Sequence, residues 1–343
     1  ESELIASDFV YKPQKIVVDR AERMYIQATG VFEGLLSLDA QGRFLQYFGS
    51  NRVEMTAQML IDLFWKRILS REQRERMASF VPIEYSNAFI DRDDFIYATV
   101  VKSTNSYNEL KKLNALGNNV LRISPFSTTL YPRNDYGDHP VAWIDAKPYD
   151  TMFSDVLVSP DGVIHALDAQ RGRVFLYDED SNLLGVFGGQ GEQLGSFRQP
   201  SSFVLIGQRL VVLDAMKNTL TEFVPTPFGD KVFEATRLYG DGLYLEATEP
   251  WQDVLRMCVN YNLAYIGLGK SHMRLEEYRE AMRDFRLGYD RKGYSDALKE
   301  LSLEFGRRNL GWILLGILLL GTLGFLWFRR RKAPDPVRCS EPP

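Results

Sequence analysis

Three aspartates stand where their carboxylates could bind a metal ion. Asp19, Asp91 and Asp168 each end a short apolar segment, so the strands that carry them could bring the carboxylates together around one channel. Aspartate is equally an ordinary residue of the turn that follows a strand, because its side chain accepts hydrogen bonds from nearby backbone N–H groups. We favour the turn role for all three, and we predict no catalytic residue, no metal site and no cofactor.

The other residues that often carry chemistry lack partners in the sequence. The histidines His139, His165 and His272 have no second metal ligand nearby, and the HExxH, CxxC and GxSxG motifs do not occur. The glycine-rich segment FGGQGEQLGSF at 187–197 lacks the GK[ST] ending of a phosphate-binding loop. A connection between repeated units explains its glycines better.

The composition is that of a globular protein without affinity for nucleic acid. Of the 343 residues, 45% are hydrophobic and 25% are charged, and the net charge of −4 gives no basic footprint for nucleic acid. Cys258 and Cys339 are too few for a disulfide scaffold. Because the sequence begins at Glu1 and shows no signal peptide, we expect that N-terminal residues are missing.

One short pattern occurs twice. SLDAQGRFLQYFGS at 37–50 aligns without gaps with LYDEDSNLLGVFGG at 176–189, so that Asp39 matches Asp178 and Phe48 matches Phe187. Each copy is typical of a strand, a polar turn and a second strand. The pattern belongs to longer units of apolar strands and turns, which lie at 15–39, 87–123, 155–178 and 201–225.

Each unit predicts four short strands over roughly 40 residues, the size of one β-propeller blade. The order of apolar strand, acidic turn, apolar strand and YD..G..L..FG resembles the NHL-repeat family of β-propellers over residues 10–247. The resemblance implies a mainly β fold of stacked blades, six in a complete ring. Four blades are recognisable, and a fifth is expected if 140–150 and 244–250 are strands of degenerate blades. We therefore assign residues 1–250 to the propeller.

The parts that are not repeated are where we expect binding. Residues 52–80 place apolar side chains at helical spacing and predict a helical insertion, which we interpret as a lid over a blade edge rather than a docking helix. The segment YPRNDYGDHP at 131–140 is polar and aromatic, so it could bind a protein or a glycan. The predicted binding surface consists of Trp65, Tyr131, Arg133, Asp135, Tyr136 and His139.

After Pro250 the pattern becomes helical. Residues 265–290 resemble a tetratricopeptide repeat, in which small residues let two helices approach and large ones fill the space between them. We interpret residues 251–306 as a spacer built from one such repeat and its flanking helices, with a peptide-binding groove as the alternative. The residues that carry the resemblance are Leu268, Gly269, Tyr278, Ala281, Phe285 and Gly288.

Residues 309–328 contain no charge and predict a single membrane-spanning helix within 307–332. Twenty helical residues span about 30 Å, the thickness of the hydrocarbon layer of a bilayer. Four basic residues follow this stretch, whereas only two, Arg307 and Arg308, directly precede it. Because the more basic side usually faces the cytoplasm, we expect residues 333–343 to form a cytoplasmic tail and the propeller to lie outside the cell. The four are Arg329, Arg330, Arg331 and Lys332.

These features predict a membrane-anchored extracellular propeller that binds a protein or a carbohydrate without catalysing a reaction. The domain order resembles surface proteins of Gram-positive bacteria, a resemblance that implies a role beside a carbohydrate uptake system. The alternative is a membrane-tethered hydrolase or lyase of the lactonase type, which would need the aspartates as metal ligands. A third interpretation makes the propeller an assembly platform for a membrane complex.

Overall fold

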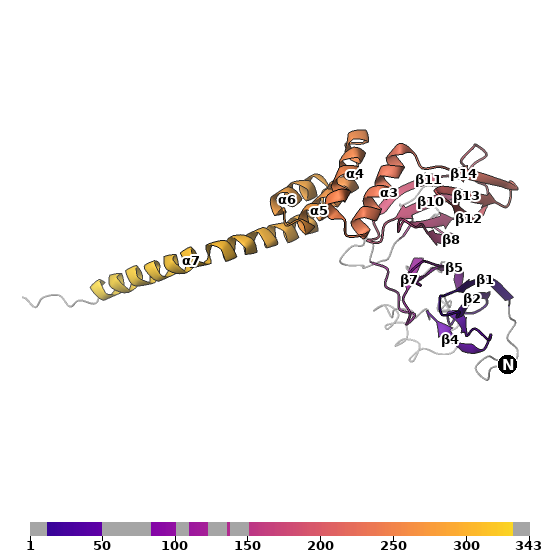
Figure 1. The fold of residues 1–343 in the computed structure, drawn as a ribbon, viewed down its shortest axis with the longest axis horizontal. Coiled ribbons are helices and arrows are strands. Elements are labelled where there is room, and N and C mark those ends of the chain that lie inside the picture. The colour runs from indigo at the N-terminus through magenta and orange to yellow at the C-terminus, as the bar shows by residue number, and fades with distance from the viewer. Residues whose placement is uncertain (1–11, 50–83, 101–109, 123–135, 138–150, 332–343) are drawn as a thin grey trace, which may run out of the picture. The chain divides into compact units, whose positions relative to one another are not determined.

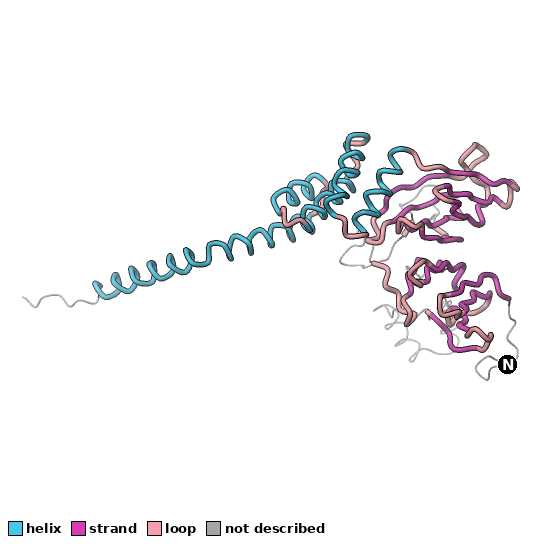
Figure 2. Tube along the Cα trace, viewed as in Figure 1, coloured by secondary structure: helices cyan, strands magenta, loops and turns pink. Residues whose placement is uncertain are grey.

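The computed structural model describes residues 12–49, 84–100, 110–122, 136–137 and 151–331. The helical insertion predicted at 52–80 lies outside these residues. The chain divides into two compact units, Glu1–Met257 and Cys258–Pro343, which we call the sheet unit and the helical unit. In the described residues, strands precede residue 224 and helices follow it (Figure 1, Figure 2).

Four antiparallel sheets follow one another along the chain, and each is a meander whose strands are adjacent in sequence order. The first sheet contains β1 (Lys12–Val18), β2 (Met24–Thr29), β3 (Leu35–Leu38) and β4 (Phe44–Phe48), and the second contains β5 (Tyr85–Ile90), β6 (Ile96–Val100) and β7 (Leu110–Leu113). The third contains β8 (Phe153–Val158), β9 (Ile164–Asp168), β10 (Arg173–Tyr177) and β11 (Leu183–Gly188), and the fourth contains β12 (Pro200–Ile206), β13 (Arg209–Asp214) and β14 (Thr219–Phe223). The predicted strand, turn and strand of the duplicated pattern are confirmed as β3–β4 and β10–β11.

One five-residue turn occurs six times: it joins five of the strand pairs and also follows β7. In each, the backbone N–H of the first residue donates to the carbonyl of the fifth, and the N–H of the fourth donates to the carbonyl of the first. The fourth residue has a positive φ, which glycine adopts most readily. The first residues of the six turns are Asp19, Asp39, Asp91, Asn114, Ser159 and Asp178.

The sheets pack face to face through apolar side chains. β6 is buried along its whole length, because successive side chains of a strand point to opposite faces and this strand lies between two sheets. Ile96 and Ala98 join a cluster with Tyr25 and Leu35 of the first sheet. Tyr97 joins a second cluster, with Phe153, Phe175 and further residues of the third sheet. In the same way β12 contacts β8 and β9 of the third sheet.

A buried carboxylate joins three of these sheets. Asp155 of β8 is 2% exposed, and its Oδ1 accepts hydrogen bonds from Asn87 Nδ2 of β5 and from the backbone N–H of Val156, both at 2.9 Å. Its Oδ2 accepts from Ser202 Oγ at 2.6 Å and from the backbone N–H of Phe203 at 3.1 Å, both in β12. Burial raises the pKa of Asp155, while these donors and Lys15 oppose the rise. Because the donors come from β5, β8 and β12, the carboxylate fixes the second, third and fourth sheets against one another.

Two helices complete the sheet unit and correct one prediction. α3 (Pro227–Gly240) begins at Thr226, whose Oγ1 accepts a hydrogen bond from the N–H of Gly229 at 3.2 Å, and α4 (Tyr244–Met257) follows. The expectation that 244–250 is a strand of a fifth blade is wrong, and the propeller assigned to 1–250 ends its strands at Phe223. The physical reason is the apolar spacing, which buries residues one helical turn apart on α4: Ala247, Trp251 and Val254.

The helical unit consists of α5 (Asn262–Arg274), α6 (Tyr278–Leu287) and the long α7 (Arg291–Arg331). α5 and α6 pack closely because two glycines lie in their interface. A Cβ atom on Gly269 would meet the Phe285 ring at 2.7 Å, and one on Gly288 would meet Ile266 Cγ1 at 2.8 Å. No single helix of the described chain is both long and apolar enough to cross a bilayer. Two pieces of α7, Arg291–Trp312 and Leu314–Phe328, are long and apolar enough only when they are taken together. Their axes are bent by 53° relative to each other.

The Asp155 contacts make a prediction about stability. Replacing Asp155 by Ala leaves the Asn87 amide, the Ser202 hydroxyl and two backbone N–H groups buried without an acceptor, so the free energy of unfolding should fall by about 3 kcal/mol. Urea unfolding of the full chain measures the change. The matched control is Asp39→Ala, because Asp39 also accepts three hydrogen bonds but lies at an exposed turn where water replaces it. Equal losses for the two variants would contradict the role of Asp155.

Candidate functional site

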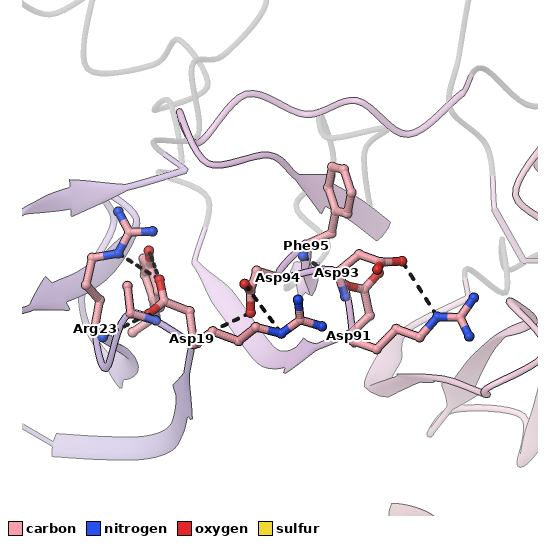
Figure 3. Close-up of polar contacts among 10 residues, drawn as sticks. Asp19, Arg23, Asp91, Asp93, Asp94 and Phe95 are labelled. Carbon is pink, nitrogen blue, oxygen red and sulfur yellow. Dashed lines mark hydrogen bonds and ion pairs between the residues drawn. The ribbon is translucent and has the colours of Figure 1, made fainter.

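The aspartates that could have held a metal instead bind the backbone of their own turns (Figure 3). Asp19 Oδ1 accepts hydrogen bonds from the N–H groups of Ala21 and Arg23, both at 2.9 Å. Its Oδ2 accepts from Arg23 Nε at 2.7 Å and from the Tyr25 hydroxyl at 3.1 Å. Burial acts to raise the pKa of Asp19, but the hydrogen bonds outweigh it and the pKa lies below its ordinary value. Its carboxylate is thus used within one hairpin.

Asp91 closes the corresponding turn of the second sheet. Its Oδ1 accepts from the N–H groups of Asp93 and Phe95, both at 2.9 Å, and burial raises its pKa (Figure 3). The two turns also contact each other, because the N–H of Arg20 donates to Asp94 Oδ1 at 3.2 Å and the Arg20 guanidinium lies 3.9 Å from Asp94 Oδ2. The turn role favoured for Asp19 and Asp91 is therefore the one that the contacts support.

Asp168 ends β9 and holds the segment that enters its sheet. Its Oδ1 accepts hydrogen bonds from the N–H groups of Met152 at 3.1 Å and Gln170 at 2.9 Å. Asp214 does the same at the end of β13, where it accepts from the N–H of Arg198 at 2.6 Å and that of Lys217 at 3.0 Å. Within the residues that the structure describes, no group of three or more His, Cys, Asp or Glu side chains is arranged to hold a metal ion.

Sequence reasoning missed a row of polar residues on the first strands of the sheets. Lys15, Asn87, Asp155 and Ser202 occupy equivalent places, because each follows the register shift of its strand pair. Three of them meet at the Asp155 carboxylate, and the charge of Lys15 lowers its pKa. The signal is present in the sequence, where each unit has one polar residue four or five places before the first turn residue: KIVVD, NAFID, DVLVS and SFVLIG.

A cavity of about 650 Å³ lies between the third sheet, the fourth sheet and α3. Four phenylalanines line it: Phe187 of β11, Phe223 of β14, and Phe228 and Phe233 of α3. Among the described residues, Asp161 is the only acidic one that lines the cavity, and its carboxylate lies 3.6 Å from Arg237 Nε of α3. A cavity of this size with mostly apolar walls is typical of a small-molecule site.

His165 of β9 lines the same cavity and is 5% exposed. Its Nδ1 lies 3.0 Å from the carbonyl oxygen of Val163. A carbonyl only accepts, so Nδ1 carries the proton and Nε2 is an acceptor in the neutral ring. Burial lowers the pKa of His165 to about 4, with the Val163 contact opposing it, so the ring is neutral at physiological pH.

The second described histidine, His272, has the opposite environment. It joins α5 to α6 through Nδ1, which lies 2.8 Å from Asp284 Oδ2, and its Nε2 lies 3.7 Å from Glu277 Oε2. The hydrogen bond to Asp284 raises the pKa of His272, although partial burial opposes the rise. This pair stabilises the α5–α6 interface when the imidazole is protonated.

The predicted binding surface is mostly outside the described residues. Trp65, Tyr131, Arg133, Asp135 and His139 lie in segments that the structure does not describe, so their role stays a prediction. Tyr136 is described and is 3% exposed. Its hydroxyl contacts the carbonyl of Arg122 and Ser181 Oγ, both at 2.7 Å, so this side chain packs in the core.

The residues of the helical resemblance have packing roles. Leu268, Ala281 and Phe285 are buried, and Gly269 and Gly288 allow the close approach of α5 and α6. Tyr278 begins α6. Of the four basic residues predicted to flank a membrane span, Arg329, Arg330 and Arg331 end α7, and Lys332 lies beyond the described residues.

Comparison with known proteins gives remote structural likenesses. No protein-family model matches the sequence, and no curated protein matches it. A Bacteroides caccae protein of unknown function is 12% identical with a TM-score of 0.33, covering 62% of this chain and 61% of its own. Virginiamycin B lyase from Staphylococcus aureus is 13% identical with a TM-score of 0.34, covering 63% and 57%. A streptogramin B lyase is 10% identical with a TM-score of 0.32, covering 63% and 55%. This chain thus spans about three fifths of these three solved chains, and these values identify neither a family nor an activity.

Buried His165 predicts a loss of stability in acid. Its pKa of about 4 in the folded protein lies below the ordinary value of 6.5, so the unfolded chain binds the proton more readily between these values. The free energy of unfolding should therefore fall by about 3 kcal/mol as pH is lowered from neutral to about 4. The reference is the variant His165→Leu, which keeps all the carboxylates of the protein but has no imidazole to take up a proton at this position. Parallel pH profiles of unfolding for the two proteins would contradict the prediction.

His272 predicts a pH dependence of opposite sign. Its folded pKa is raised above 6.5, so its contribution to stability is fully present below about pH 6.5 and is lost as pH rises through the folded value. Thermal unfolding followed by helical circular dichroism should show this loss in the wild type. The His272→Gln variant keeps a hydrogen-bonding side chain and should not show it. If the unfolding midpoint of the wild type does not fall relative to that of the variant as pH rises above 6.5, the His272–Asp284 pair is not a stabilising contact.

Proposed function

We propose that this protein is a membrane-tethered binding module: a β-propeller of the NHL type outside the cell, a spacer of the tetratricopeptide type, and a single membrane anchor formed by α7. The propeller supplies the binding surface, and the anchor keeps it at the membrane. The role beside a carbohydrate uptake system that the sequence resemblance implies belongs to this proposal.

The order in which the sheets pack supports the propeller. β1 contacts β5, β5 contacts β8, and β8 contacts β12, so the first strands of consecutive sheets are neighbours. The blades of a propeller are antiparallel meanders that stack face to face around an axis, with their first strands innermost. The polar row from Lys15 to Ser202 lies on these strands, as expected for the side that faces the axis.

The exposure of α7 is the observation that carries the membrane tether. Residues 309–328 contain no charged side chain. Large apolar side chains on every side of this stretch are exposed, among them Leu310, Trp312, Leu315, Leu320, Phe325 and Trp327. A helix that is apolar all round needs an apolar environment on all sides, which a bilayer supplies. The basic residues Arg329 to Lys332 then favour a cytoplasmic C-terminus.

The hydrogen bonds of the aspartates favour a binding role over the lactonase-type alternative. A metal-dependent hydrolase or lyase would need Asp19 and Asp91 to present their oxygens to an ion. These oxygens accept hydrogen bonds from the backbone of their turns instead. The cavity beside His165 offers a binding place that needs no metal.

The tether is tested by the variant Leu318→Arg/Leu320→Arg. An arginine at the centre of a spanning helix costs about 3 kcal/mol, so this double variant should leave the alkali-resistant membrane fraction, in which the wild type should remain. The matched control is Leu303→Arg, which lies in the part of α7 before the apolar stretch and should stay in the membrane. Extraction of the wild type by alkaline carbonate would overturn the tether.

The orientation has a separate test. Protease added to intact cells should remove the sheet unit, and full protection of the sheet unit would overturn the orientation.

A further inference from the structure

We propose that the cavity between the third sheet, the fourth sheet and α3 binds a neutral small molecule with an apolar ring system and one hydrogen-bond donor. This inference rests on the binding role proposed above, and it does not depend on the membrane tether. The argument follows from the walls of the cavity, its charges and its buried polar group.

The walls favour a ring system. Phe187 and Phe223 are in contact, with ring centroids 4.8 Å apart, and Phe228 and Phe233 line the cavity from α3. Aromatic side chains bind flat apolar groups by stacking and edge contacts. The volume of about 650 Å³ is that of a typical small-molecule site.

The charges favour a neutral molecule. Among the described residues that line the cavity, none is a lysine or an arginine, so an anion would lose its hydration without gaining a cationic partner. Asp161 is already close to Arg237, at 3.6 Å, so it is not free to balance a cation. A sugar is also disfavoured, because it needs a partner for each of several hydroxyl groups.

His165 sets the polar requirement. Its Nδ1–H donates to the carbonyl of Val163, so Nε2 is the ring atom left to accept a hydrogen bond from a bound molecule. Two other polar lining groups already accept hydrogen bonds from the backbone: Ser159 Oγ from Val163, and Thr226 Oγ1 from Gly229. Gln208 also lines the cavity, but it is exposed to solvent. A molecule with one hydroxyl or N–H group placed at Nε2 therefore fits the buried polar groups of the cavity.

The wall formed by the third sheet offers a way to fill the cavity without disturbing the backbone. Gly185 of β11 lines it, has an ordinary φ, and a Cβ atom added there would meet nothing within 4 Å. Replacing Gly185 by Leu should fill the cavity. Gly189 is also free of neighbours within 4 Å of an added Cβ but does not line the cavity, so Gly189→Leu is the matched control.

Three probes test the proposal on the full chain in lipid nanodiscs, by equilibrium dialysis with empty nanodiscs subtracted. 1-Naphthol has a ring system and a hydroxyl donor, 1-methoxynaphthalene has the same ring without the donor, and 1-naphthoate is an anion. The wild type and Gly189→Leu should bind 1-naphthol about fivefold more tightly than 1-methoxynaphthalene, the value of one hydrogen bond. Gly185→Leu should bind at least about tenfold more weakly. His165→Phe should abolish the preference for the hydroxyl.

Each contrary result overturns a defined part. Unchanged binding by Gly185→Leu would show that the probe binds elsewhere, and equal binding of the two neutral probes to the wild type would remove the role of His165. Tighter binding of 1-naphthoate would contradict the preference for a neutral molecule. No binding above empty nanodiscs would overturn the proposal. Membrane retention is measured separately on the same protein. A failure of the membrane tether can therefore be distinguished from a failure of the cavity to bind the probe.

Discussion

The fold depends on the placement of one buried carboxylate, Asp155. Apolar faces hold sheets together but are weakly directional, so two sheets could slide over each other at little cost. The four hydrogen bonds to Asp155 are directional, and their donors lie on three different sheets. Removing the carboxylate from water costs free energy, as its raised pKa indicates. The hydrogen bonds offset this cost only when the donors from β5 and β12 are in place. The same group therefore fixes the relative positions of the sheets and disfavours arrangements that separate them.

Much of this architecture could be predicted from local chemistry, and the parts that were not depend on contacts between distant segments. The strands around the repeated turns follow from apolar segments ending at Asp19, Asp39, Asp91 and Asp178, because the side chain of each aspartate folds back on its own hairpin. The position of Asp155 in the sequence gives no hint that Asn87 and Ser202 will meet it, since these residues are 68 and 47 positions away. α3 and the part of α4 before residue 251 were missed for a different reason: the expectation of a fifth blade extended the repeat past the point where the apolar period changes from two to about 3.6.

The two described histidines illustrate how burial and partners decide the chemistry of one residue type. His165 is 5% exposed, its ring lies beside that of Phe233, and its Nδ1 contacts a carbonyl, so it stays neutral. His272 is next to the carboxylate of Asp284, so its protonated form is stabilised. Neither outcome can be read from the sequence, in which His165 follows Ile164 and His272 follows Ser271. The consequence is that acid weakens the sheet unit through His165, while alkali weakens the helical unit through His272.

The cavity itself follows from a difference in strand number. The third sheet has four strands and the fourth has three in the described residues, so the outer strand β11 extends beyond the last strand that faces it. α3 follows β14 directly and covers that place, with Phe228 and Phe233 directed to the same cavity as Phe187 of β11. A helix is a rod about 10 Å across and a strand is a ribbon, so a helix cannot fill the space of a missing strand evenly. The space that remains is bounded by residues of both sheets and the helix. This is why His165, the second residue of β9, can line a cavity although it is almost completely buried.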